Sequence, residues 1–217
     1  MKKSPSSLFS SCLRFSHAFV LALVMWLLPA LGFGQNRIII DGTDANDHGS
    51  ASGGVNLEGW RYMQKALEAL APQVANGKKV VVDLGTKTGT QARNASTSAF
   101  GLSSLPPAGW TIAYINGTTD IATFLDGGTV GGISVNDVGL LYIPTASNSS
   151  GDLSTAEIAV INARAASVAN LVNNLGVALF AMGQNSQKSL WSRGYIHAPR
   201  LVLRFKSYSL THLDLWL

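Results

Sequence analysis

The sequence predicts an α/β fold: a three-layer, mostly parallel sheet of about five strands, doubly wound and flavodoxin-like, that follows an N-terminal signal peptide. Two observations carry this prediction. Short, continuous apolar runs rich in β-branched residues alternate with amphipathic helical stretches, as expected of strands that are buried on both faces of a sheet. Short connections join these segments, which favours right-handed strand–helix–strand crossovers.

Residues 1–34 have the composition of an export signal. The segment carries basic but no acidic residues, and its apolar run Ala18–Leu28 spans eleven residues before Pro29. A run of that length is too short to cross about 30 Å of hydrocarbon comfortably, but it suits the apolar core of a signal peptide. We therefore expect cleavage near residue 34 and a secreted or periplasmic protein. The alternative is an uncleaved membrane anchor that runs to Phe33.

The net charge of +4 comes from the two ends of the chain. Residues 35–184 contain eight basic and eleven acidic residues, hence −3. A nucleic-acid-binding protein needs a basic stripe on its folded body, so we exclude a nucleic-acid partner. Cys12, the single cysteine, lies within the predicted signal, and the mature protein therefore has neither a disulfide nor thiolate chemistry.

The body, residues 35–184, contains five predicted strands and three predicted helices. Helix 57–70 begins after Asn56 as its cap, and helix 154–174 begins with the capping box Ser154–Glu157. A shorter helix is expected over 118–125, and polar loops over 42–56 and 85–109. The strands are Arg37–Asp41, Lys79–Asp83, Thr111–Ile115, Val138–Ile143 and Val177–Met182.

The last segment, residues 185–217, departs from this pattern. It is basic and aromatic and has no clear helical stripe, although Arg200–Phe205 alternates in the manner of an edge strand. Two interpretations stay open. The segment is either an extra strand of the sheet, or a C-terminus that is not native to the fold, for instance after a shifted reading frame.

Ligands of open parallel sheets bind outside the carboxyl ends of the strands. Collecting the polar residues that follow each predicted strand therefore gives a candidate crevice. The ligand-binding residues expected there are Asp41, Thr43, Asp44, Asp83, Asn116, Thr145 and Gln184. Asp47, Thr86 and Lys87 lie beside them in the sequence.

The segment 41–49 is the densest polar cluster. Asp44, Asn46 and His48 occupy alternate positions before Gly49, which is similar to the start of a calcium loop, but Val55 stands where that loop places a bidentate Glu. A metal site on Asp44, Asn46 and His48 is thus one interpretation. An Asx-rich turn is the other.

Several catalytic and cofactor motifs are absent from the sequence. It contains no Gly-x-x-x-x-Gly-Lys-Ser/Thr run, no Gly-x-Gly-x-x-Gly after the first strand and no Gly-x-Ser-x-Gly elbow. Gly53-Gly54, before the first predicted helix, could seat an anion. His48 is the only histidine in the body. We expect no cofactor.

The pattern resembles the class I glutamine-amidotransferase-like superfamily, in particular its ThuA-like branch. The resemblance rests on the first strand ending at Asp41, the strand that leads to Pro144-Thr145, the helix 154–174 and the segment Leu175–Gly183, which contains the final predicted strand. The family places a nucleophilic Cys at the turn after that last strand. Here the turn reads Ala181-Met182-Gly183-Gln184, so the resemblance implies no amidotransferase activity.

The sequence thus predicts an exported, non-catalytic α/β domain that binds a small molecule, a glycan or an envelope partner. One alternative is a metal-assisted hydrolase that uses Asp41, Asp44, Asp47 and His48. Another is a truncated or frame-altered copy without function.

Overall fold

The computed structural model describes residues 37–145 and 152–183. The predicted signal segment, the segment 185–217 and Gln184 lie outside these residues. Five strands form one sheet in the order β1-β7-β6-β4-β5, and every neighbouring pair in it is parallel. The strands are β1 (Ile38–Asp41), β4 (Val80–Leu84), β5 (Thr111–Ile115), β6 (Leu140–Ile143) and β7 (Ala178–Met182). The predicted parallel α/β sheet is confirmed.

The strand order places the first strand at an edge, beside the last one. The remaining four strands run β5-β4-β6-β7, which is the 2-1-3-4 order of flavodoxin-like sheets, and β1 occupies the place that a fifth strand takes there. The connection from β1 to β4 therefore passes over two strands, β7 and β6.

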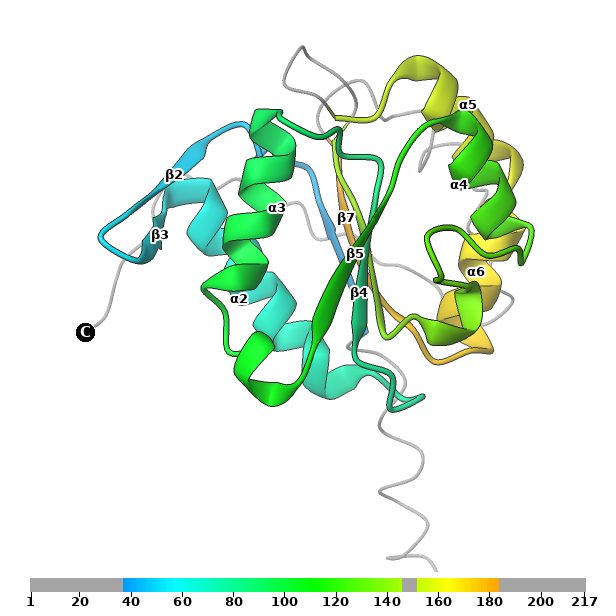
Figure 1. Cartoon of the computed structure of the whole chain (residues 1–217), viewed down its shortest axis with the longest axis horizontal. Coiled ribbons are helices and arrows are strands. Elements are labelled where there is room, and N and C mark those ends of the chain that lie inside the picture. The colour runs from blue at the N-terminus through cyan, green and yellow to red at the C-terminus, as the bar shows by residue number, and fades with distance from the viewer. Residues whose placement is uncertain (1–36, 146–151, 184–217) are drawn as a thin grey trace, which may run out of the picture.

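Helices cover both faces of the sheet (Figure 1). On one face lie α2 (Glu58–Leu70) and α3 (Gln91–Gly101). On the other lie α4 (Thr118–Leu125), α5 (Thr155–Ala163) and α6 (Ala165–Asn173). Three short 3-10 turns join these elements: Ala71–Gln73, Pro106–Ala108 and Val135–Asp137.

The alternation of side chains along each strand divides the core into two layers. In β4, Val81 packs with α2 and α3, whereas Val82 and Leu84 pack with α4 and α6. Because both faces are covered, β6 and β7 are buried at every position, which explains their continuous apolar sequence. The continuous apolar pattern stops at the polar residues that end the strands, and the candidate functional site lies among these residues.

A β-hairpin replaces much of the predicted loop 42–56. Its strands are β2 (Gly49–Ser52) and β3 (Val55–Leu57), which pair antiparallel. Gly53 and Gly54 adopt positive φ angles of 57° and 79° in the turn, as two-residue hairpin loops require. They are therefore not at a helix N-terminus. The prediction of Asn56 as a helix cap was also wrong, because its amide contacts Gln64 and Ser98 instead.

The predicted polar loop 85–109 was wrong over Gln91–Gly101, which form α3, and over the 3-10 turn Pro106–Ala108. Apart from Phe100, the buried face of α3 is made of small side chains, which allow the helix to pack closely on the sheet without a stripe of large apolar residues. The buried residues are Ala92, Ala95, Ser96, Ala99 and Phe100.

The predicted single helix 154–174 is interrupted at Arg164. Its φ and ψ angles of −117° and 24° end α5, and α6 begins at the next residue. The Arg164 guanidinium donates two hydrogen bonds of 2.8 Å to the Asp126 carboxylate after α4. The predicted capping box at Ser154 and Glu157 is confirmed.

Among the helices within residues 37–145 and 152–183, none is long and apolar enough to cross a bilayer.

Candidate functional site

The chain leaves the adjacent strands β4 and β6 toward opposite faces of the sheet. From β4 it continues into α3, and from β6 it continues toward α5, on the other face (Figure 1). In open parallel sheets, ligands bind in a crevice at such a switch point, and we use the word crevice here for this edge of the sheet. The described residues around this crevice come from the ends of β4 and β6, from the segment before α5 and from the loop between β1 and β2.

The first turns of two helices hold the loop after β1 in place. The indole Nε1 of Trp60 donates to the Asn46 carbonyl at 3.2 Å, and the Gly59 N–H donates to the His48 carbonyl at 2.8 Å. Gln91, in the first turn of α3, donates to the Asp47 carbonyl at 2.6 Å. A β carbon at Gly59 would overlap the carbonyl oxygens of Ala45 and His48, so this close approach needs glycine.

Asp152 lies at the centre of the crevice and has no exposed surface. The chain returns there to the end of β6, since the Leu153 N–H donates to the Thr145 carbonyl at 3.2 Å. The amide Nδ2 of Asn46 donates to Asp152 Oδ1, and Thr145 Oγ1 donates to Asn46 Oδ1 at 3.4 Å. Asp152 Oδ2, by contrast, is buried and has no hydrogen-bond partner among the described residues.

Burial and negative neighbours make the ionised form of Asp152 unfavourable. Burial, together with the charges of Asp47 and Asp83, raises the pKa of the Asp152 carboxyl to about 7, although the neighbouring Thr145 hydroxyl and the hydrogen bond from Asn46 act in the opposite direction. Burial likewise raises the pKa of Asp83. Burial also raises the pKa of Tyr142, with further contributions from Asp83, Asp152 and Asp47. These groups therefore form one electrostatically coupled acidic site.

A second set of contacts orients Asp83 at the end of β4. Thr86 donates to it from its backbone N–H at 3.3 Å and from its hydroxyl at 2.7 Å. Arg93 in turn donates to the Thr86 hydroxyl at 2.9 Å and to the Thr86 carbonyl at 2.6 Å. The Arg93 guanidinium lies 3.7 Å from the centre of the Tyr114 ring. The guanidinium is thus already occupied by contacts within the protein.

The structure brings some of the predicted ligand-binding residues together and separates others. Asn116 donates to the Thr86 carbonyl at 3.0 Å, beside Asp83, and Thr145 lies with Asp152. Asp41 and Thr43 instead pair with each other at the exposed end of β1. Burial raises the pKa of the nearby Tyr62, and Asp41 adds to this effect.

The residues of the predicted metal site point in different directions. His48 Nε2 lies 3.1 Å from Asp44 Oδ2, whereas the side chain of Asn46 is buried against Asp152 and Thr145. Within 37–145 and 152–183, no three His, Cys, Asp or Glu side chains gather closely enough to hold a metal ion.

Sequence reasoning missed Asp152, which is the central residue of the crevice. It lies nine residues after the end of β6, just before the capping box of α5, and thus outside the residues that directly follow a strand. The sequence offered one weak signal for this residue, because Asp152 is an acidic residue just before a predicted helix. Acidic residues are favourable near helix N-termini, however, so this position alone does not indicate a site. Its contacts with Asn46 and Thr145 depend on tertiary structure.

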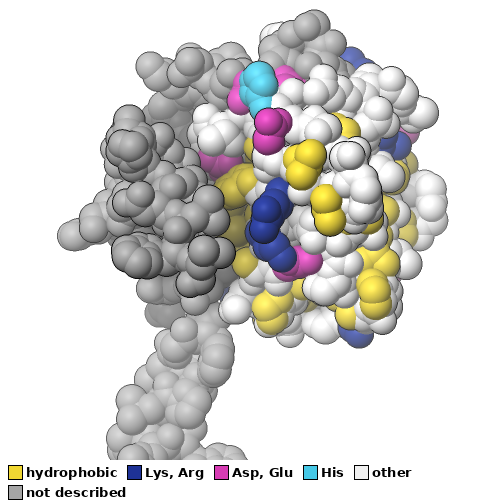
Figure 2. All heavy atoms as spheres, turned by 90° about the vertical axis from the view of Figure 1, so that its left-hand side faces the viewer, with side chains coloured by type: hydrophobic (Ala, Val, Ile, Leu, Met, Phe, Trp, Pro, Cys, Tyr) yellow, Lys and Arg dark blue, Asp and Glu magenta, His cyan; other side chains and the backbone are white. Residues whose placement is uncertain are grey.

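Figure 2 shows the side of the molecule that carries α2, α3 and the hairpin. At one end of this view, acidic side chains lie beside His48, which is the single histidine among the described residues. Large exposed apolar residues, among them Val55 and Tyr62, lie between polar ones. Scattered apolar side chains of this kind are ordinary on protein surfaces.

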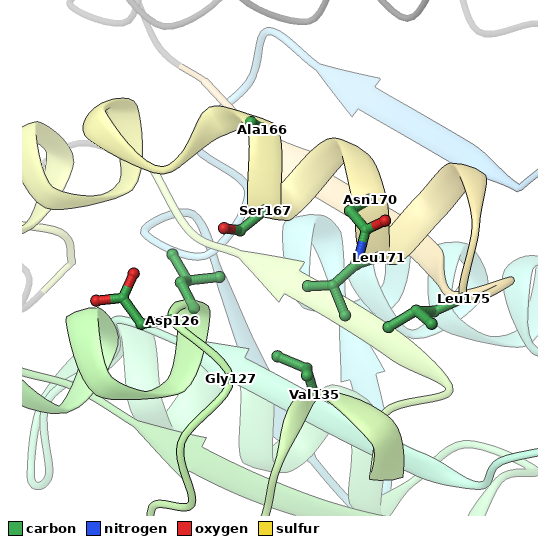
Figure 3. A pocket seen from close by; sticks show the side chains of 9 residues that line it. Asp126, Gly127, Val135, Ala166, Ser167, Asn170, Leu171 and Leu175 are labelled. Atoms are coloured by element: carbon green, nitrogen blue, oxygen red, sulfur yellow. The ribbon is translucent and has the colours of Figure 1, made fainter.

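A second hollow of about 370 Å³ lies on the opposite face, between the end of α4 and α6 (Figure 3). Leu125, Val135 and Leu171 make much of its lining apolar. The polar groups at its rim have partners: Asp126 is paired with Arg164, and the Asn170 side chain accepts a hydrogen bond from Asn174. It therefore offers less recognition chemistry than the acidic crevice.

Gly85 shapes the turn after β4, and we expect Gly85→Ala to lower the free energy of unfolding by about 1–2 kcal/mol. Its φ is +131°, and a β carbon would overlap the buried side chain of Leu153. Urea unfolding measures the effect. Gly89→Ala is the matched control, because Gly89 also has a positive φ but no atom near its β-carbon position. Equal costs for the two variants would contradict the role given to Leu153.

The fold and the site define an α/β domain with neighbouring acidic side chains at the switch point of a parallel sheet. Comparisons with protein-family models, with curated proteins and with solved structures find no match to this chain.

Proposed function

We propose that this chain is an exported, non-catalytic domain that binds a small hydrophilic ligand, such as a glycan fragment of the cell envelope, in the crevice around Asp152. The unpartnered, buried Oδ2 of Asp152 is the observation that carries this proposal. A buried polar atom without a hydrogen bond costs about 1–3 kcal/mol. A bound ligand that donates a hydrogen bond to this oxygen removes that cost.

The position and chemistry of the crevice support binding. Carboxylate and hydroxyl groups of Asp47, Asp83, Thr86 and Thr145 supply acceptors and donors from three separate segments, as recognition of a hydroxylated molecule requires. Export by the predicted signal peptide and a distant relationship to the amidotransferase-like superfamily are parts of the same proposal. The proposal of a non-catalytic role rests on the Ala181-Met182-Gly183 turn, where that superfamily places its nucleophile.

Thermal unfolding in the presence of neutral and amino-containing glycans and of peptidoglycan fragments tests this function. A ligand at a hundred times its Kd stabilises the folded state by about 2.7 kcal/mol. We expect at least one compound of the panel to stabilise the wild-type chain. Thr145→Val removes the hydroxyl beside Asp152, and we expect it to weaken binding at least tenfold.

Thr111→Val is the matched control, because Thr111 is exposed at the opposite end of the sheet, at the start of β5. It should bind as the wild type does. Failure of every compound to stabilise the protein, or equal losses for the two variants, would contradict the proposal.

One observation favours a second function, acid–base hydrolysis. Because the pKa of Asp152 is raised to about 7 beside other carboxylates, a protonated and an ionised carboxyl can coexist near neutral pH, as such catalysis needs. Mass spectrometry of the incubated fragments separates the two functions. Intact fragments support a binding domain, and fragments cleaved by the wild type but not by Asp152→Asn support a hydrolase.

A further inference from the structure

We infer that the ligand of this site presents a protonated primary amine, which donates to Asp152 Oδ2 in the neighbourhood of Asp47 and Asp83. This inference rests on the proposed function and specifies the chemical class of the ligand. It follows from the hydrogen-bonding groups, the charges and the geometry around one buried carboxylate.

The hydrogen-bonding groups require a donor from the ligand. Asp152 Oδ1 already accepts from the amide of Asn46, whereas Oδ2 has no partner in the described part of the chain. The Asn46 side chain is also engaged: its Oδ1 accepts from Thr145, and its Nδ2 donates to Asp47 Oδ1 at 3.2 Å as well. The protein side chains named here therefore leave an acceptor open, and a ligand group without an N–H or O–H cannot fill it.

The charges favour a cation over a neutral donor. Asp47 and Asp83 both act on Asp152 with like charge, and the other groups acting on it, Thr145 and Asn46, are neutral. The nearby Arg93 donates to Thr86 and stacks on Tyr114, on the side of Asp83. A hydroxyl group would satisfy Oδ2 but leave the repulsion between carboxylates. An ammonium group supplies the hydrogen bond and balancing charge together.

The geometry favours an ammonium over a guanidinium or a metal ion. A guanidinium binds best to two adjacent acceptor atoms, but Asp152 has only Oδ2 open, and an ammonium is a compact charge that needs no such pair. A metal ion needs several ligands converging on one point. Among the described residues no three acidic or histidine side chains do so.

Binding of small amines, followed by NMR at pH 8 through the backbone amides of Thr145 and Leu153, tests the inference. The probes are ethanolamine and putrescine, which stay protonated because aliphatic amines titrate near pH 10. The uncharged counterparts are ethylene glycol and N-acetylethanolamine for ethanolamine, and butane-1,4-diol for putrescine. We expect each amine to bind the wild type at least tenfold more tightly than its counterparts, and methylguanidine to bind more weakly than either amine.

Asp152→Asn should abolish this preference, whereas Asp120→Asn, at an exposed position in the first turn of α4, should keep it. Equal binding of amines and neutral counterparts would overturn the inference, as would no amine binding at millimolar concentration. The glycan panel and the Thr145→Val variant decide the proposed function separately. A neutral glycan that binds through Thr145 would sustain that function even when the amine inference fails.

Discussion

Asp152→Asn is expected to raise the free energy of unfolding at pH 8 by about 2–4 kcal/mol. The wild-type carboxyl is fully buried and has a pKa raised to about 7, first by burial and then by Asp47. At pH 8 it must be ionised inside the protein. The amide of Asn is neutral, its oxygen can still accept from Asn46, and its NH₂ group can donate toward the neighbouring carboxylates. Urea unfolding at several pH values measures the difference.

The pH dependence has a definite sign. An unfolded Asp carboxyl titrates near pH 4, so between about pH 4 and pH 7 the folded protein binds more protons at Asp152 than the unfolded chain does. The contribution of Asp152 therefore lowers stability as the pH rises through this window and is constant above it. The gain from Asp152→Asn should be small at pH 4 and largest above pH 7.

Asp120→Asn, the control on the exposed first turn of α4, should change stability by about 0.5 kcal/mol or less at every pH. A loss of stability in Asp152→Asn that is the same at pH 4 and pH 8 would contradict a buried charge at Asp152. If Asp152→Asn both stabilises the fold and removes ligand binding, Asp152 is a residue that serves function although it lowers stability.

Glu157→Ala is expected to lower the free energy of unfolding by about 3 kcal/mol. Glu157 is 2% exposed. Its Oε2 accepts from the Ser154 N–H at 2.8 Å and from the Ser154 hydroxyl at 2.6 Å, and its Oε1 accepts from the Gly117 N–H at 2.7 Å. It thus joins the first turns of α5 and α4. Alanine would leave these backbone donors without their partner.

Glu157→Gln is the conservative control and should cost about half as much, because one amide oxygen can still accept a hydrogen bond. The pH dependence is opposite to that of Asp152. Burial raises the pKa of Glu157, but hydrogen bonds from Ser154 and Gly117 outweigh it, and the net pKa is lowered. Its contribution is therefore present above the pKa of the unfolded carboxyl and lost as the pH falls through the lower folded value. Equal stability of Glu157→Ala and the wild type at pH 7 would refute this role.

The parallel sheet could be predicted because its physical cause is local. Runs such as Val80–Leu84 and Leu140–Ile143 are apolar at nearly every position, and only burial on two faces explains that pattern. The helix α3 could not be predicted in the same way, since its buried face consists of Ala and Ser with Phe100 as its one large apolar residue. A signal was nevertheless present: Ala92, Ala95, Ser96 and Ala99 follow helical spacing.

The site could be predicted only in part. The rule that ligands meet the carboxyl ends of strands selected Asp83 and Thr145, and the structure places both at the switch point. It also selected Asp41 and Thr43, which pair with each other instead. The rule did not select Asp152, because this residue does not directly follow a strand. It lies next to the end of β6 only through tertiary contacts before α5, and no local sequence pattern predicts these contacts.

The titration of the Asp152 side-chain carboxyl carbon by ¹³C NMR, with and without ethanolamine, tests the proposed recognition chemistry most directly. The groups that face this carboxyl are Asn46 and Asp47 from the loop after β1, Asp83 from β4, and Tyr142 and Thr145 from β6. We predict a pKa of about 7 for the free protein and a clearly lower pKa with the amine bound, because the ammonium stabilises the carboxylate. A carboxyl that titrates near pH 4 in the free protein, or whose pKa is unchanged by saturating amine, would contradict it.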